Sequence, residues 1–374
     1  MTKWLHISDV HFGRPFRSRT ENGQQFLIDR QQNAFRQAIQ FAMEEEVTGV
    51  LITGDLFDTK TPSFIHVHQV QQAINRLADA GIPTFLLSGN HDPAPGYRGL
   101  KTPGGGHIFS SGEPVGIPLM KGGQPVAMVY GCGYEENWDA VNRVQSYPIH
   151  QEDLPAIGLA HCSVVGKAFG DQVDQYQPCT QDDLASRGYH YWALGHIHMP
   201  PELDWVPGGY GGSLMGLDPS ETGPHGGWLV TLDATYQPVK RFIPFGGTTF
   251  SLVDHQVEAE SLMGLTQDLV ALLASTQVRD QCVRVNLSGR SPLYRDLKSE
   301  AVLSDLATQL EWETGAIEVD IRSGVGPRID LEELISLSPY LASLNQVARD
   351  LGEGDDRIQR AKEELLDRLV KHAD

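Results

Sequence analysis

Five short stretches of the chain carry side chains that commonly bind metal ions. In chain order they are Asp9-Val10-His11, Gly54-Asp55, Gly89-Asn90-His91-Asp92, His161 and Gly195-His196-Ile197-His198. A mixture of imidazole, carboxylate and amide ligands suits Mn²⁺, Fe²⁺ or Zn²⁺ better than Mg²⁺ or Ca²⁺. If the last pair lies in a strand, residues i and i+2 point to the same side, so that both imidazoles could reach one point.

The number of candidate ligands indicates two ions rather than one. The seven side chains are those of Asp9, His11, Asp55, Asn90, His161, His196 and His198. They exceed the needs of one ion with open positions for substrate, whereas two ions that share a carboxylate would use them all. Two ions about 3.5–4 Å apart are a common device for phosphoester hydrolysis, because they clamp the attacking and leaving oxygens and supply hydroxide.

Each of these groups lies toward the end of a stretch that begins with an apolar run of the kind that forms a buried strand. The stretches are residues 3–11, 49–58, 83–92, 156–164 and 191–200. Near-continuous apolar strands are typical of a sheet that is covered on both faces. Residues 25–46 and 64–80 carry apolar side chains at helical spacing. Strands that alternate with helices predict an α/β layered domain with its active site at the carboxyl ends of the strands.

The length of the chain, 374 residues, predicts more than one domain. Residues 1–245 are predicted to form the domain that holds the metal-binding groups, and the stretch "FGGTTF" (245–250) is its expected boundary. Residues 246–329 predict a small α+β capping domain. Residues 330–374 carry apolar side chains at near-helical spacing with a break at 352–356, which predicts two C-terminal helices.

The composition is that of an ordinary globular protein, with 40% hydrophobic and 21% charged residues. No stretch approaches a membrane span, the N-terminus has no apolar signal-peptide core, and the four scattered cysteines are interpreted as free thiols, so we expect a cytoplasmic protein without a membrane partner. The net charge of −19 argues against a protein that coats nucleic acid by bulk attraction. It leaves open a nuclease whose metals neutralise phosphate locally.

The metal-binding groups, taken in order, resemble the calcineurin-like metallophosphoesterase superfamily. The patterns D-x-H, G-D-x-x-D, G-N-H-D, a lone histidine and G-H-x-H are all present between residues 9 and 198. The resemblance implies an α/β fold, namely a four-layer α/β/β/α metallophosphoesterase sandwich with a small α+β capping domain and C-terminal helices. It also implies that His196 and His198 send one imidazole to each metal.

The resemblance assigns a role to each candidate ligand by its position. The first metal would be held by Asp9, His11 and His198, the second by Asn90, His161 and His196, and both by Asp55. His91 resembles the family's catalytic histidine, which stabilises the transition state or protonates the leaving oxygen. The implied cofactors are two divalent ions, with Mn²⁺ expected and Fe²⁺ or Zn²⁺ as alternatives. Asp58 and Asp92 would either orient their neighbours or cap turns.

Within the superfamily, the chain resembles the SbcD-type nuclease subunits. "SDVHFGRPF" (8–16) and "GDLFDTKTPS" (54–63) resemble their first two blocks. "YGGSL" (210–214) resembles the Y-P-G-S element after G-H-x-H, with Gly211 in place of the proline, and "VRVNLSGRSPLYRDL" (283–297) is similar to the cap of their YhaO-like branch. This implies a phosphodiesterase that acts on DNA as an exonuclease or endonuclease in DNA repair. Its partner would be an SbcC-like ATPase, docked by residues 330–374, and a homodimer stays open.

Two other functions remain open at this point. One is a small-molecule phosphatase or cyclic-nucleotide phosphodiesterase of the same superfamily, although such proteins are usually shorter and lack an extra C-terminal domain. The other is a scaffold whose metals only hold the fold, against which the complete ligand set and His91 count. Arg14, Arg17 and Arg19 form a basic cluster near the first group that would guide phosphate, with Arg14 and Arg17 as the expected contacts, the alternative being a solvated loop.

Overall fold

The computed structural model describes residues 2–151, 153–165, 175–199 and 207–328, together with residues 342, 343 and 346. The chain divides into two compact units, Met1–Ser251 and Leu252–Asp374. The C-terminal helices predicted for residues 330–374 lie outside the described residues, except for the three helical residues just named. None of the helices in the described part of the chain has the length and hydropathy that crossing a membrane requires.

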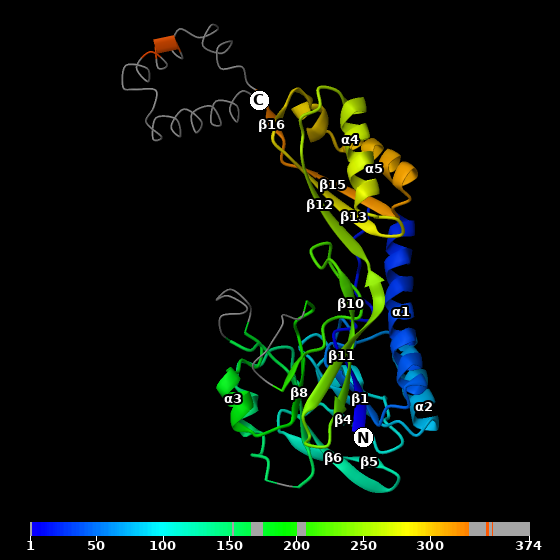
Figure 1. Ribbon diagram of the computed structural model, residues 1–374, viewed down its shortest axis with the longest axis vertical. Helices are drawn as coiled ribbons and strands as arrows, with labels where there is room; N and C mark the ends of the chain where they lie inside the picture. Colours follow the sequence, from blue (N-terminus) through cyan, green and yellow to red (C-terminus); the bar gives the residue numbers. More distant parts are fainter. Residues whose placement is uncertain are drawn as a thin grey trace. The chain divides into compact units, whose positions relative to one another are not determined.

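Two sheets form the middle of the first unit (Figure 1). The six-stranded sheet has the order β11-β10-β1-β2-β3-β4, and the five-stranded sheet has the order β5-β6-β7-β8-β9. The first consists of β1 (Thr2–Ile7), β2 (Gly49–Thr53), β3 (Thr84–Leu87), β4 (His107–Phe109), β10 (Pro224–Leu232) and β11 (Pro238–Thr248). The second consists of β5 (Val115–Lys121), β6 (Gln124–Gly131), β7 (Ala156–His161), β8 (Tyr191–Gly195) and β9 (Gly208–Tyr210). β1 to β4 are parallel to one another, as are β6 to β9.

Helices cover the outer face of each sheet. α1 (Glu21–Glu44) and α2 (Phe64–Asp79) pack on the six-stranded sheet, where Phe35 and Ile74 share a buried cluster with strand residues. α3 (Gln181–Ser186) lies on the opposite side of the unit (Figure 1). It packs on the five-stranded sheet, as does the 3₁₀ turn η2 (Arg143–Ser146). A further 3₁₀ turn, η1 (Ala94–Tyr97), follows β3.

The two sheets pack on each other through a buried cluster of their inward side chains. Trp4 and Phe85 come from the six-stranded sheet, and Ile157 and Tyr191 from the five-stranded sheet, all fully buried. Burying both faces of both sheets requires strands without polar alternation, which is what the apolar runs provide. The predicted four-layer α/β/β/α sandwich is confirmed.

The second unit is the small α+β fold that its pattern predicts. Its three-stranded sheet has the order β12-β13-β15 and is covered by two helices, and a separate two-stranded sheet is formed by β14 and β16. The elements are β12 (Phe250–Gln256), α4 (Leu262–Ser275), β13 (Cys282–Ser288), β14 (Arg290–Ser291), η3 (Pro292–Tyr294), η4 (Asp296–Lys298), α5 (Glu300–Thr314), β15 (Glu318–Ser323) and β16 (Gly326–Pro327). Leu269, Val285 and Leu310 lie in its core and are fully buried.

Candidate metal centre

The candidate ligands lie at the carboxyl ends of β1, β2, β3, β7 and β8: His161 is the last residue of β7, and the others lie in the turns that follow their strands. Four of them have a left-handed backbone, with φ of 48° at Asp9, 54° at His11, 48° at Asp55 and 101° at His196. This conformation is uncommon for residues other than glycine and costs about 1–3 kcal/mol. It is held by backbone hydrogen bonds such as His11 N to the Asp55 carbonyl, 2.9 Å. Strain of this kind is concentrated at functional sites.

His196 and His198 do not lie in a strand. The expectation that strand alternation points both imidazoles to the same side is therefore wrong. β8 ends at Gly195, and His196 turns out of the sheet with its φ of 101°. The two imidazoles consequently point to different places. The ring of His196 lies 5.3 Å from the ring of His161, whereas the ring of His198 lies 4.9 Å from that of His11.

A first group of ligand atoms is formed by Asp9, His11 and His198. The Nε2 atoms of the two histidines are 3.1 Å apart, and they lie 4.0 and 3.9 Å from Asp9 Oδ1. Two nitrogens that bind the same ion at about 2.1 Å, with a near-right angle between the two bonds, lie about 3 Å apart. The two imidazoles are therefore spaced to share a cation.

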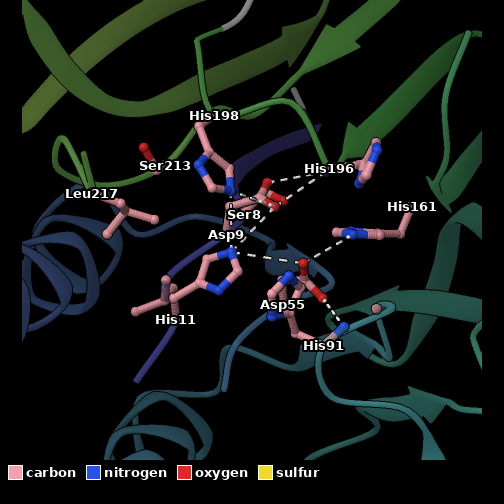
Figure 2. Close-up of polar contacts among 12 residues, drawn as sticks. Ser8, Asp9, His11, Asp55, His91, His161, His196, His198, Ser213 and Leu217 are labelled. Carbon is pink, nitrogen blue, oxygen red and sulfur yellow. Dashed lines mark hydrogen bonds and ion pairs between the residues drawn. The ribbon is translucent and has the colours of Figure 1, made fainter. Parts of the chain in front are cut away.

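A second group meets the first at Asp55. Asp55 Oδ2 lies 3.3 Å from His161 Nε2 and 3.6 Å from His11 Nε2, and so faces both groups (Figure 2). Asn90 Oδ1 is 3.0 Å from His161 Nε2. The backbone N–H of His196 donates to both carboxylate oxygens of Asp9, at 3.2 and 3.1 Å. The structure thus brings all seven predicted ligands together, with Asp55 between the two groups.

Three of the histidines have their Nδ1 atoms fixed by an acceptor at 2.8 Å. The pairs are His11 with Asp58 Oδ1, His161 with the Thr53 carbonyl oxygen, and His198 with Glu221 Oε1. Because a carbonyl or carboxylate oxygen can only accept, Nδ1 carries the proton and Nε2 keeps its lone pair for a cation. The predicted orienting role of Asp58 is thereby explained by its contact with His11.

Asp55 and His161 shift each other's ionisation. Burial disfavours the charged form of Asp55, but the charge and hydrogen bond of His161, together with the charges of His11 and His91, hold the pKa of this carboxyl well below its usual range. Burial likewise disfavours the charged form of His161, but Asp55 raises the pKa of this histidine to about 10. A cation bound here replaces the His161 proton, because a metal ligand must be deprotonated.

Asp92 ties together the turns after β2 and β3. Its carboxylate accepts the backbone N–H groups of Gly89 (2.8 Å), Asp55 (3.2 Å) and Phe57 (2.9 Å) and the Tyr97 hydroxyl (2.8 Å). Burial, followed by the charge of Asp55, raises the pKa of Asp92 to about 8, while these hydrogen bonds act in the opposite direction. Asp92 therefore orients the backbone of a candidate ligand, and turn capping is the means by which it does so.

Glycine is required at two places where the turns approach the ligands. A Cβ atom at Gly89 would lie 2.2 Å from Asp55 Oδ1. At Gly54, whose φ is +91°, a Cβ atom would lie 2.3 Å from His161 Nδ1. The glycine of the G-N-H-D pattern therefore makes room for Asp55, and the glycine of the G-D pattern makes room for His161.

The remaining predicted residues surround this centre. His91 donates its backbone N–H to Asp55 Oδ1 (2.9 Å), and its ring lies 4.8 Å from the ring of His11. The His91 side chain is 43% exposed, with Nδ1 at 3.6 Å from Asp58 Oδ1. Arg14 places Nη1 3.6 Å from the same Asp58 oxygen, and Arg17 is exposed on the same loop.

Sequence reasoning missed Glu221. It lies 23 positions after His198, in a turn rich in glycine and proline, and its half-buried carboxylate contacts His198 through Oε1 and the Leu217 N–H through Oε2 at 2.8 Å. No spacing pattern links such a residue to the histidine pair. The only available signal is that "YGGSL" precedes it by a few residues.

The chain belongs to the calcineurin-like phosphoesterase family, whose sequence pattern matches residues 2–200. It is accordingly a hydrolase of phosphoester bonds, and its Asp/His cluster is able to bind metal ions.

Three similar proteins extend the comparison. The chain is 28% identical over 356 residues to the uncharacterized metallophosphoesterase YhaO of Bacillus subtilis, a match that covers 91% of this chain and 85% of that protein. It is 30% identical over 230 residues to the DNA double-strand break repair protein Mre11 of Aeropyrum pernix, covering 54% of this chain and 50% of that protein. It is 24% identical over 343 residues to the DNA double-strand break repair protein Mre11 of Archaeoglobus fulgidus, covering 81% of this chain and 75% of that protein.

Replacing Glu221 by glutamine is expected to weaken Mn²⁺ binding and to lower turnover, each by about 10- to 100-fold. The carboxylate serves two donors, the Nδ1–H of His198 and the N–H of Leu217, and an amide offers a single oxygen. Titration calorimetry with Mn²⁺ measures the first effect independently of activity. Asp218→Asn, an exposed carboxylate of the same turn, is the matched control. Unchanged Mn²⁺ affinity in Glu221→Gln would show that His198 is held without this contact.

Proposed function

We propose that this protein is a two-metal phosphodiesterase that cleaves DNA, as the nuclease subunit of an SbcC/SbcD-like repair complex. The observation that carries the proposal is the position of Asp55 Oδ2, which faces His11 on one side and His161 on the other at 3.6 and 3.3 Å. The similarity to proteins named for DNA double-strand break repair supports DNA as the substrate.

The donor set fits two divalent ions. Asp9, His11 and His198 would hold one ion and Asn90, His161 and His196 the other, with Asp55 shared between them. Counting the shared Asp55, each set offers two imidazole nitrogens and two oxygens, a mixture that favours Mn²⁺, Fe²⁺ or Zn²⁺, and we propose Mn²⁺. Two such ions, when bound, polarise the phosphoryl oxygens and make a water molecule nucleophilic.

The protein's own groups would position the substrate and supply a proton. His91 is accessible to a phosphodiester because nearly half of its side chain is exposed. Its Nδ1 faces Asp58, which leaves Nε2 to donate a hydrogen bond or a proton to the leaving oxygen. Arg14 and Arg17, on the loop after β1, would attract the flanking phosphates against the overall negative charge of the chain.

The proposal extends to the organisation of the whole chain. Residues 1–245 would be the nuclease domain and residues 246–329 the cap. Residues 330–374 would be the segment that docks an SbcC-like ATPase, and a homodimer is compatible with this arrangement. The support is the similarity to YhaO, which runs through 91% of the chain.

The test compares DNA with a small diester. The purified protein with Mn²⁺ is incubated with end-labelled single- and double-stranded DNA and, in parallel, with bis-p-nitrophenyl phosphate. We expect both kinds of substrate to be hydrolysed and both activities to disappear when the metal is chelated. Hydrolysis of the small diester without cleavage of DNA would instead support a small-molecule phosphodiesterase.

A further inference from the structure

A column of aromatic rings leads from the metal centre to the surface. The Tyr176 ring lies 5.1 Å from the ring of His196, a candidate ligand, at an angle of 59°. The Trp138 ring lies 4.8 Å from the Tyr176 ring in an edge-to-face arrangement at 67°. Trp138 is 57% exposed, although tryptophan is on average one of the more buried residues. A large flat ring is thus presented to solvent two ring contacts away from a candidate metal ligand.

The column is fixed to the site by hydrogen bonds on both sides of Trp138. Asn137 donates its side-chain Nδ2–H to the Asn90 carbonyl at 2.7 Å, which joins the loop to another candidate ligand. Asp139 accepts from Arg143 Nε at 2.7 Å, and its carbonyl accepts the N–H of Gln177 at 2.7 Å. Residues 137–139 and 176–177 are therefore held together, so the ring is displayed on a preorganised support.

The charges around Trp138 indicate which part of a nucleotide it can contact. Glu135 and Glu136 precede it in the same loop and are exposed. Two carboxylates repel a phosphate backbone, whereas the basic residues Arg14 and Arg17 lie on a different loop. An aromatic surface flanked by negative charge suits the uncharged face of a nucleobase.

We propose that Trp138, supported by Tyr176, is a stacking site for one unpaired nucleobase next to the cleaved phosphodiester. This inference rests on the proposed function and narrows its substrate to DNA that is single-stranded at the point of cleavage. A base inside a duplex has both faces covered by its neighbours, so only an unpaired base has a face free for the ring.

The experiment measures hydrolysis by the full-length, Mn²⁺-loaded protein on two oligomers of equal length. One is oligothymidylate and the other carries abasic nucleotides throughout. We expect Trp138→Ala to raise KM for oligothymidylate by about 5- to 150-fold, the range measured for loss of one base–aromatic stack, and to leave KM for the abasic oligomer nearly unchanged. Trp138→Phe should restore most of the loss. Trp312→Ala, whose ring is 87% exposed in the other unit, is the matched control.

A binding measurement keeps this inference separate from the proposed function. Oligothymidylate added to the metal-free protein should quench tryptophan fluorescence, and the quench should disappear in Trp138→Phe but not in Trp312→Phe. If the wild type binds in this way yet cleaves no DNA, the nuclease proposal fails and the stacking site stands. If Trp138→Ala changes neither the quench nor KM, or changes KM equally for both oligomers, the stacking site is overturned. Equal thermal midpoints of the variants exclude misfolding as the cause.

Discussion

Asp55→Ala is expected to lose both metal ions and all measurable phosphodiester hydrolysis. Its Oδ2 atom lies 3.6 Å from His11 Nε2 in the first group and 3.3 Å from His161 Nε2 in the second. Removing it deprives both groups of a negative charge and leaves His161 without its nearest counter-charge. Elemental analysis after Mn²⁺ loading measures the number of bound ions. Hydrolysis is measured with bis-p-nitrophenyl phosphate as the substrate.

Two variants show whether this loss is specific. His11→Ala removes a ligand of one group only and is expected to keep about one ion per chain. Asp79→Ala, an exposed carboxylate at the end of α2, is expected to behave as the wild type. Two ions still bound to Asp55→Ala would refute the bridging position, provided that circular dichroism shows the same fold in all variants.

His91→Ala is expected to keep both ions and to lose turnover by about 10²–10⁴-fold, the usual contribution of a general acid. The side chain of His91 lies beside the ligands without being one of the proposed seven, and its ring faces His11 at 4.8 Å. If it protonates the leaving oxygen, the loss should depend on the leaving group. The measurement is kcat on two diesters, one that releases p-nitrophenolate and one that releases an alkoxide.

The alkyl diester should be affected far more, because p-nitrophenolate departs without a proton. His68→Ala, an exposed histidine of α2, serves as the control. An equal loss on both diesters would assign His91 to stabilisation of the phosphoryl group rather than to proton donation. An unchanged kcat on the alkyl diester would remove His91 from the mechanism.

The layers of the fold could be predicted because each element carries a strong local pattern. The apolar side chains at helical spacing in residues 25–46 and 64–80 correspond to the helices α1 (Glu21–Glu44) and α2 (Phe64–Asp79). The strands predicted from the sequence are longer than those in the structure, because the apolar runs continue beyond the last residue of each strand. Leu56 and Phe57, for example, are fully buried but lie after the end of β2 at Thr53. Hydrophobicity reports burial, and it does not distinguish a strand from the buried turn that follows.

The candidate site was predictable in its ligands and less so in their surroundings. The seven residues are polar groups at the ends of apolar runs, a pattern that the sequence shows directly. The interpretation that strand alternation lets His196 and His198 reach one point was wrong, because β8 ends at Gly195. Glu221, which contacts His198, and Trp138, which contacts Tyr176, lie in loops, and a loop has no periodicity from which a long-range contact can be deduced.

The candidate ligands come from both sheets, and this has a consequence for how the protein unfolds. Asp9, Asp55 and Asn90 follow strands of the six-stranded sheet, whereas His161 and the histidine pair belong to the five-stranded sheet. The proposed pair of ions, when bound among them, would be a cross-link that closes loops of up to nearly 190 residues in chain separation, as between His11 and His198. Such a link disfavours the open chain much as a disulfide does. The hydrophobic layer between the sheets could then be exposed to water only after the ions have left, so ion dissociation would set the pace at which the loaded enzyme comes apart.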